Sequence, residues 1–286
     1  MPESERRLPF PGREFAYTER DFERVRRLIF ALAGISLSPA KRELVYNRLA
    51  RRLRAGGFAT FADYLDRIER SDGAEREAFV NALTTNLTAF FREPHHFFVL
   101  AQHLRRASAS AMQTIWSCAS SSGEEPYSIA MTAVETFGTY EPPVRILASD
   151  VDSEVLERAR SGIYPRERVA QLEPERLRRF FLRGSGANAG QVRVRPELRA
   201  LVVFRRLNLL DRDWPLRGPL DAIFCRNVMI YFDKPTQLAI LERFAPLLRP
   251  DGLLFMGHSE ALHHAAHLFR PCGRTVYGLA ARSGAP

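Results

Sequence analysis

Residues 115–150 constrain the fold of this chain more than any other stretch. They have the pattern of a buried strand, a loop of small residues, a helix and a second strand that ends in Asp150. Every residue from 119 to 123 is small, so the backbone of this loop can approach a ligand closely. Pro126 stands at the start of the predicted helix, where its missing N–H does no harm. In a doubly wound sheet, a turn after one strand and a carboxylate after the next is typical of a nucleoside-binding site.

The same loop lacks the features that bind phosphate groups. It has neither the G-x-G-x-x-G spacing of dinucleotide sites nor a G-K-[ST] phosphate loop. Glu125, at the helix start, would repel a phosphate and attract an ammonium group, and Asp150 is suited to accept hydrogen bonds from two ribose hydroxyls. A cofactor with adenine, ribose, no phosphate and a cationic amino-acid end fits, which predicts S-adenosylmethionine. Glu124 adjoins Glu125, and we choose Glu125 because it sits against Pro126; a purely structural role for the loop stays open.

The spacing of apolar residues divides the rest of the chain into regions. Residues 1–85 contain four amphipathic helical patterns and predict a small basic helical domain. Residues 86–106 form a linking segment that runs into a helix. In residues 107–286, strand and helix patterns alternate and predict about six strands, the last pair forming a reversed hairpin. Residues 164–200 interrupt this alternation with an Arg-rich helix and a short alternating segment, so we expect a small β-containing insertion there.

Charge and cysteine usage narrow the class of partner. The formal net charge is +9, and residues 24–54 hold nine Lys or Arg against one acid. An acidic partner is therefore expected: a nucleic acid, an anionic membrane or an acidic protein surface. The three cysteines form no metal-spaced pair, which favours a reduced, cytoplasmic protein. No apolar run approaches the roughly 20 residues that span a bilayer, so no membrane insertion is expected. No metal site is expected either, because no Cys or acid at suitable spacing accompanies His263, His264 and His267.

Five longer motifs occur in order along the chain. They are TTNLTAFFRE (84–93), GEEPYS (123–128), ASDVD (148–152), FCRNVMIYFD (224–233) and LLRPDGLLFMGHSE (247–260). With these motifs the sequence resembles the chemotaxis receptor methyltransferase family, CheR, from about residue 20 to the C-terminus. The resemblance implies an α/β fold with a doubly wound, mostly parallel sheet of the Rossmann-like methyltransferase type, preceded by an all-helical domain.

The resemblance also implies a reaction and a set of cofactor-binding residues. The reaction is the transfer of a methyl group from S-adenosylmethionine to glutamate side chains of bacterial chemoreceptors, which adapts chemotaxis signalling. The products are glutamyl γ-methyl esters and S-adenosylhomocysteine. The cofactor-binding positions that match the family's motifs are Asn86, Thr88, Arg92, Glu125, Asp150, Asn208, Leu209, Arg226 and Asn227.

Elementary chemistry limits what catalysis must supply. A glutamate side chain has a pKa of about 4.3, so at neutral pH it is already a nucleophile and needs no general base. The enzyme must orient this carboxylate and exclude water. Arg92 and Tyr231 are the candidate catalytic residues, and the resemblance implies that both lie near the methyl group. The alternatives are a salt bridge from Arg92 to Glu93 and a core position for Tyr231 beside Phe232.

The resemblance implies partners for the two basic regions. The helix at 39–54 would dock onto the acidic helical bundle of a receptor, and the 164–200 insertion grips a receptor's C-terminal tail in some relatives. A solvated face remains the alternative for the basic helix. Two other functions stay open: an RNA methyltransferase that uses the same basic surfaces, and a non-catalytic adaptor that senses S-adenosylmethionine. The stretch CRNVMIYF (225–232) lacks the Asn/Asp-Pro-Pro-aromatic motif of many RNA methyltransferases, so nucleic acid is not the expected partner.

Overall fold

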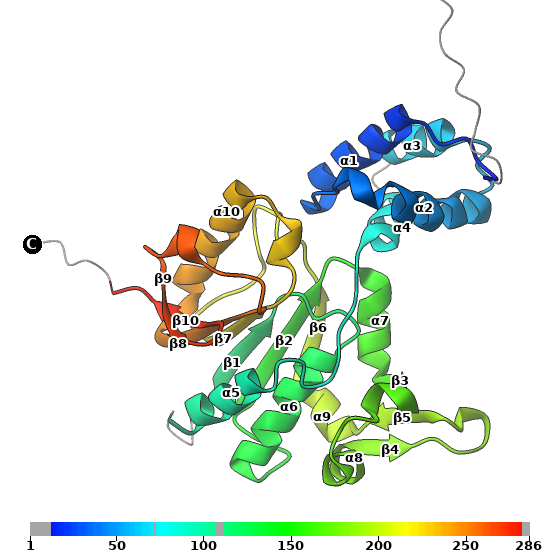
Figure 1. Ribbon diagram of the computed structural model, residues 1–286. Helices are drawn as coiled ribbons and strands as arrows, with labels where there is room; N and C mark the ends of the chain where they lie inside the picture. Colours follow the sequence, from blue (N-terminus) through cyan, green and yellow to red (C-terminus); the bar gives the residue numbers. More distant parts are fainter. Residues whose placement is uncertain (1–12, 71–72, 107–110, 282–286) are drawn as a thin grey trace, which may run out of the picture. The chain divides into compact units, whose positions relative to one another are not determined.

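The chain divides into two compact units, Met1–Thr85 and Asn86–Pro286. A computed structural model describes residues 13–70, 73–106 and 111–281 (Figure 1). Residues 107–110, where the sequence placed the start of the last domain, lie outside the described residues, and the 86–106 segment lies in the second unit. Within the described ranges, none of the helices combines the length and the apolar composition that crossing a bilayer requires.

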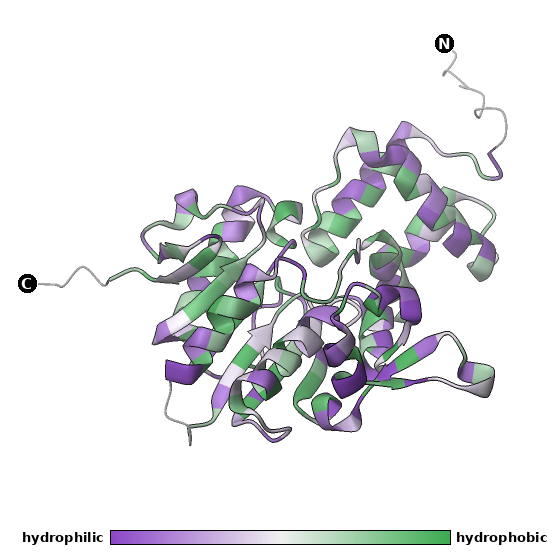
Figure 2. Cartoon of the chain, turned by 60° about the horizontal axis from the view of Figure 1, so that its bottom comes forward, coloured by the Kyte–Doolittle hydropathy of each residue, from purple (hydrophilic) through white to green (hydrophobic). Residues whose placement is uncertain are grey.

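The described residues of the first unit form helices. They are α1 (Glu19–Ala33), η1 (Pro39–Lys41), α2 (Arg42–Gly56), α3 (Phe61–Arg70) and α4 (Ala74–Leu83). Thr18 starts α1 with a reciprocal capping box, and Gly34 ends it in the left-handed conformation with φ 69°. Purple and green residues alternate along these helices in Figure 2, because each helix buries one apolar face against the others.

A seven-stranded sheet organises the second unit. Its order is β6-β2-β1-β7-β8-β10-β9. The parallel strands are β1 (Gln113–Ser117), β2 (Val144–Asp150), β6 (Val202–Arg206), β7 (Leu220–Cys225) and β8 (Leu248–Met256). From β1 the chain winds outward through β2 and β6, and from β7 it winds the other way through β8. The order therefore reverses between β1 and β7, and the crevice beyond the carboxyl ends of these strands is where such sheets bind ligands.

The central strands of this sheet are buried on both faces. On β7, Ala222 and Phe224 belong to one hydrophobic cluster, and Ile223 and Cys225 belong to another. Successive side chains of a strand point to opposite faces, so the two clusters lie on the two sides of the sheet. The helices around it are α5 (His95–Arg106), α6 (Glu124–Phe137), α7 (Ser153–Ser161), α9 (Pro196–Ala200) and α10 (Lys234–Phe244). The predicted fold class, a doubly wound and mostly parallel α/β sheet after a helical domain, is confirmed.

The predicted insertion forms a second, antiparallel sheet. Its order is β3-β5-β4, with β3 at Ile163–Pro165, β4 at Phe181–Arg183 and β5 at Gln191–Val194 (Figure 1). The connections carry η2 (Arg166–Val169), α8 (Pro174–Phe180) and η3 (Gly186–Asn188).

The strand count predicted for the main sheet was one too low. The expected hairpin is present, because β10 (Val276–Leu279) pairs antiparallel with β8. The missed strand is β9 (Phe269–Gly273), which pairs with β10 at the edge of the sheet. Only its first residue is buried, so the sequence shows no alternation there, and it contains Pro271, which is tolerated on an edge strand.

Candidate active site

The candidate site lies at the carboxyl ends of β1, β2 and β7. Glu125 is in the first turn of α6, Asp150 is the last residue of β2, and Arg226 follows β7 directly. The loop between β1 and α6 turns sharply, with Ser121 at φ 47° and Gly123 at φ 98°. A β-carbon on Gly123 would lie 2.8 Å from the hydroxyl of Tyr164, so this turn requires glycine for both conformation and space.

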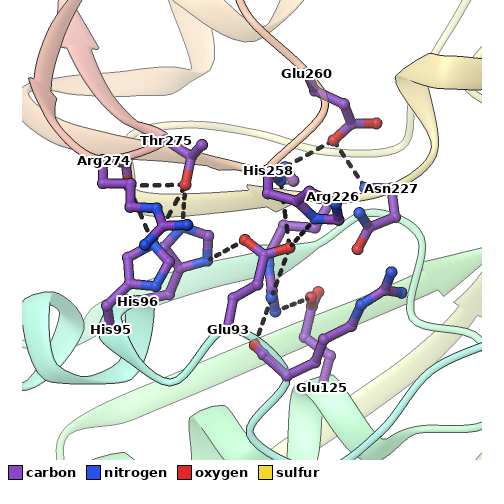
Figure 3. Close-up of polar contacts among 12 residues, drawn as sticks. Glu93, His95, His96, Glu125, Arg226, Asn227, His258, Glu260, Arg274 and Thr275 are labelled. Carbon is purple, nitrogen blue, oxygen red and sulfur yellow. Dashed lines mark hydrogen bonds and ion pairs between the residues drawn. The ribbon is translucent and has the colours of Figure 1, made fainter.

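Of the two neighbouring acids, Glu125 is the one that points toward the strand ends. Its Oε1 accepts a hydrogen bond of 2.7 Å from the Ser117 hydroxyl at the end of β1. Its Oε2 accepts one of 2.9 Å from the Arg226 guanidinium beyond β7 (Figure 3). Glu124 is fully buried and pairs with Ser122 and with Arg168 from η2. The geometry thus separates the two glutamates, which adjacency in sequence did not.

Asp150 is a buried carboxylate that holds the small-residue loop. Its Oδ2 accepts the backbone N–H of Ser121 at 2.8 Å, and its Oδ1 accepts that of Asp152 at 3.0 Å. Burial raises the pKa of Asp150 to about 6, and these backbone N–H donors oppose the rise. The carboxylate is therefore mostly ionised at neutral pH but close to titrating.

The segment before α5 passes over the same loop. The Asn86 side-chain amide donates to Asp152 at 2.7 Å, and the Asn86 carbonyl accepts from the Ser121 hydroxyl at 3.1 Å. The carbonyl of Thr88 accepts from Arg168 at 3.1 Å. The Arg92 guanidinium donates to the Leu87 carbonyl at 3.0 Å. Among the described residues, Arg92 forms no ion pair, so the alternative of a salt bridge to Glu93 is absent.

Arg226 joins three segments that are far apart in the sequence. Its side chain is only 2% exposed, and besides Glu125 it donates to the carbonyl of Arg92 and lies 3.7 Å from Glu93. The guanidinium is thus engaged by protein groups. The next residue, Asn227, has a left-handed backbone with φ 58° and turns the chain away from β7.

A group of metal-type side chains adjoins Arg226. Glu93, His95 and His96 have ligand atoms within 4.8 Å of one another. The His95 Nε2–H donates to the carbonyl of Arg274 at 3.2 Å, and His96 Nε2 lies 2.8 Å from the Thr275 hydroxyl (Figure 3). Burial lowers the pKa of His96 to about 3, so this imidazole is neutral. The Arg226 cation beside Glu93 opposes a second cation, and we interpret the group as a polar network that fastens the start of α5 to the turn before β10.

The remaining predicted positions lie beyond β6 and β7. Asn208 accepts the N–H of Leu210 at 3.0 Å through its side chain, and Leu209 is buried in the core. Tyr231 ends η4 (Met229–Tyr231) and is half-buried, whereas the next residue, Phe232, is buried. Hydrogen bonds join these positions in two groups: Asn86 and Asp150 both bind Ser121, and Arg226 binds both Glu125 and the carbonyl of Arg92. The carboxyl ends of β6 and β7 bring the other positions to the same edge of the sheet, namely Asn208, Leu209, Asn227 and Tyr231.

The chemistry of these groups fits S-adenosylmethionine. Two carboxylates, Glu125 and Asp150, stand where a phosphate-binding site would offer free backbone N–H groups, and the Ser121 N–H is already taken by Asp150. Carboxylates attract an ammonium group and accept from ribose hydroxyls, and both would repel a polyphosphate. The site therefore suits a cationic nucleoside rather than a nucleotide.

Known proteins resemble this chain over nearly all its length. Residues 20–84 match the family model "CheR methyltransferase, all-alpha domain", and residues 86–278 match "CheR methyltransferase, SAM binding domain". "Chemotaxis protein methyltransferase 2" of Pseudomonas aeruginosa is 56% identical over 98% of this chain and 100% of the relative. "Chemotaxis protein methyltransferase" of Escherichia coli is 54% identical over 92% of each chain. The protein of that name from Salmonella typhimurium is 53% identical over 92% of this chain and 91% of the relative.

Proposed function

The chain belongs to the CheR methyltransferase family, and we propose that it methylates glutamate side chains of bacterial chemoreceptors. The cofactor is S-adenosylmethionine, and the proposed products are glutamyl γ-methyl esters and S-adenosylhomocysteine. The names of these relatives, chemotaxis protein methyltransferases, support a role in chemotaxis and do not favour an RNA substrate or a non-catalytic adaptor. The observation that carries the proposal is the meeting of Glu125, Asp150 and the segment of Arg92 at one edge of the sheet.

The proposed cofactor contacts follow from charge. S-adenosylmethionine, when bound, supplies a methyl group that its sulfonium charge makes electrophilic. Glu125 would hold the ammonium end, because the Ser117 hydroxyl and the Arg226 guanidinium fix its carboxylate. Asp150 would accept from the ribose hydroxyls. The further proposed contacts are Asn86, Thr88, Arg92, Asn208, Leu209, Arg226 and Asn227.

Arg92 and Tyr231 would act on the substrate carboxylate. A substrate glutamate is ionised at neutral pH, so the protein must hold it in line and keep water away. The Arg92 guanidinium forms no ion pair with the described residues, so its remaining N–H groups can bind one carboxylate oxygen while the other attacks. Tyr231, half-buried beyond β7, would donate a hydrogen bond from its hydroxyl to the substrate carboxylate. No general base is needed.

The basic helix α2 is the proposed docking surface for the receptor's acidic helical bundle. Its arginines are not equally available: Arg48 donates to the Thr84 carbonyl at 2.6 Å, and Arg52 binds Glu75 at 2.9 Å. Arg54 is exposed but pairs with Glu14, whereas Arg51 is exposed and forms no ion pair with the described residues. Arg42 also pairs, with Glu19 at 3.0 Å, and is not exposed. Arg51 and Arg54 are the exposed arginines of α2 and are therefore the residues proposed to meet an acidic partner.

The small sheet of the insertion is the proposed site for a receptor's C-terminal tail. Ile163, Arg193 and Leu182 are aligned across its three strands. All three are exposed, and strand β4 pairs only with β5, which leaves its other edge open within the described residues. A cytoplasmic location follows from a receptor's cytoplasmic bundle as substrate and is part of the proposal.

The test is the chemical nature of the transferred methyl group. Purified protein is incubated with S-[methyl-³H]adenosylmethionine and receptor-containing membranes, and the receptor is then treated with mild alkali. A glutamyl ester releases volatile labelled methanol. Label that resists alkali, or that appears only when RNA is supplied, would refute the ester assignment. Membranes without receptor are the control.

A further inference from the structure

Glu260 is a buried acid to which neither the fold nor the cofactor site has yet given a role. It lies in the loop after β8 and is 5% exposed. Its Oε2 accepts the backbone N–H of Asn227 at 2.8 Å and that of Gly257 at 2.7 Å. Its Oε1 accepts the backbone N–H of Ile230 at 3.3 Å. Two of these donors, Asn227 and Ile230, belong to the loop that follows β7, and Figure 3 shows the contact between Glu260 and Asn227.

Backbone dipoles alone compensate this carboxylate. Within the described ranges, Glu260 forms no ion pair with Arg, Lys or His. Burial raises its pKa, and the backbone N–H donors of Asn227, Gly257 and Ile230 oppose the rise. A buried carboxylate without its hydrogen bonds is strongly unfavourable, so the side chain and its donors must stay together.

The loop that Glu260 holds is tightly constrained on both sides. Asn227 has a left-handed backbone, a conformation that persists in non-glycine residues when the surroundings fix it. Gln237 on α10 donates to the carbonyls of Met229 and Phe232, at 2.9 and 3.0 Å. Glu260 therefore binds two backbone N–H groups of this loop, and Gln237 binds two of its carbonyls.

The loop after β7 and the loop after β8 also approach each other closely. A β-carbon on Gly257 would lie 2.4 Å from the Asn227 side-chain nitrogen and 2.7 Å from Oε2 of Glu260. These distances leave no room for a side chain at position 257, so only a glycine there lets the loop after β8 pack this closely against Asn227 and Glu260. Tyr231, the proposed hydroxyl donor, and Asn227, a proposed cofactor contact, both belong to the segment fixed in this way.

We propose that Glu260 is a positioning residue for methyl transfer, which sets the place of Tyr231 by gathering the backbone N–H groups of the loop after β7. The proposal rests on the function proposed above. Glu260 touches neither cofactor nor substrate and acts through the loop. A glutamine at this position keeps the shape but has one acceptor oxygen, and its amide turns an N–H₂ toward backbone donors.

The experiment compares Glu260→Gln with Glu242→Gln, a matched neutralisation of an exposed acid on α10. Receptor methylation, S-adenosylmethionine affinity and thermal unfolding are measured on each full-length protein. We expect Glu260→Gln to lower kcat about 10- to 100-fold, since small misplacements of reacting groups have effects of that size. Glu242→Gln should match the unsubstituted protein.

A double-mutant cycle with Tyr231→Phe separates positioning from general destabilisation. If Glu260 acts through Tyr231, the loss caused by Glu260→Gln shrinks several-fold when the tyrosine has already been replaced by phenylalanine. Activity is normalised to the fraction of molecules that bind S-adenosylmethionine, so a misfolded fraction does not contribute. If Glu260→Gln does not bind the cofactor at all, Glu260→Asp supplies the cycle, because it keeps the charge and shortens the reach.

Two results would overturn the positioning role. One is an unchanged normalised kcat in Glu260→Gln or, where that protein does not bind cofactor, in Glu260→Asp. The other is the same fold-loss with and without the Tyr231→Phe substitution. Absence of methyl-ester formation by the unsubstituted protein would instead contradict the proposed function, so the two failures are distinguishable.

Discussion

Replacing Asp150 by asparagine should make the protein more stable and a worse cofactor binder. In the folded protein the pKa of Asp150 is about 6, against 3.8 for an unperturbed side chain, and burial is the main cause. A difference of about 2 pKa units corresponds to about 3 kcal/mol. Asp150 binds a proton more tightly in the folded state than in the unfolded state, so its contribution to the unfolding free energy falls as pH rises from about 4 to about 6. At neutral pH the ionised carboxylate is destabilising.

The size of the effect can be worked from the contacts. An asparagine side chain at this position would avoid the burial of charge but keep only one of the two acceptors that now bind Ser121 and Asp152, a loss of about 1 kcal/mol. We expect Asp150→Asn to raise the unfolding free energy by about 2 kcal/mol at about pH 8. The loss of charge-assisted hydrogen bonds to ribose should weaken S-adenosylmethionine binding about 10- to 100-fold.

Measurements of stability and of cofactor affinity across pH check both expected effects of Asp150→Asn, the gain in stability and the loss of affinity. Urea unfolding gives the stability of the unliganded proteins, and titration calorimetry gives the affinity. The stability gain should vanish near about pH 4, where Asp150 is protonated in the folded state. Affinity of the unsubstituted protein should fall below about pH 6, and that of the variant should lack this fall. An Asp150→Asn variant that is less stable than the unsubstituted protein at about pH 8 and binds the cofactor normally would rule out both proposed roles of the buried charge.

Three further substitutions test other parts of the site. Arg92→Lys keeps the charge but loses the planar fork, so kcat for receptor methylation should fall about 100-fold while cofactor affinity, measured by calorimetry, falls less; equal losses would assign Arg92 to cofactor binding alone. Joint reversal of Arg51 and Arg54 to Glu should raise KM for receptor and leave cofactor affinity unchanged, whereas Arg70→Glu, a control reversal of an exposed arginine on α3, should change neither quantity; an unchanged KM in the double variant would remove the docking role. Gly123→Ala should lower the unfolding free energy by about 2 kcal/mol or more in urea titrations, because residue 123 has a positive φ and the added β-carbon would clash with the hydroxyl of Tyr164. An unchanged unfolding free energy would show that the turn relaxes freely.

Local pattern was sufficient to predict the central sheet and the acids at its edge. Residues 115–150 contain a small-residue loop, a helix start and a strand that ends in Asp150. In the structure these features lie where the strand order reverses between β1 and β7. The pattern did not predict the edge strand β9, because four of its five residues are exposed.

Contacts between distant residues could not be predicted in the same way. Arg226 meets Glu125 across 101 positions, and Glu260 meets Asn227 across 33. Both contacts depend on strand order, which no local periodicity contains. Glu93 was considered only as a partner for Arg92, yet its carboxylate contacts His258 and lies beside Arg226. The sequence signal that could have pointed to Glu93 and Glu260 is an acid next to a turn after an apolar run.

In the proposed reaction, the group on the receptor that accepts the methyl is a glutamate carboxylate. Peptide mass spectrometry of a purified receptor fragment, incubated with this protein and S-adenosylmethionine, tests it directly. We expect peptides heavier by one methylene group, with the added mass on glutamate and removed by mild alkali. Added mass on lysine, arginine or cysteine, stable to alkali, would contradict it.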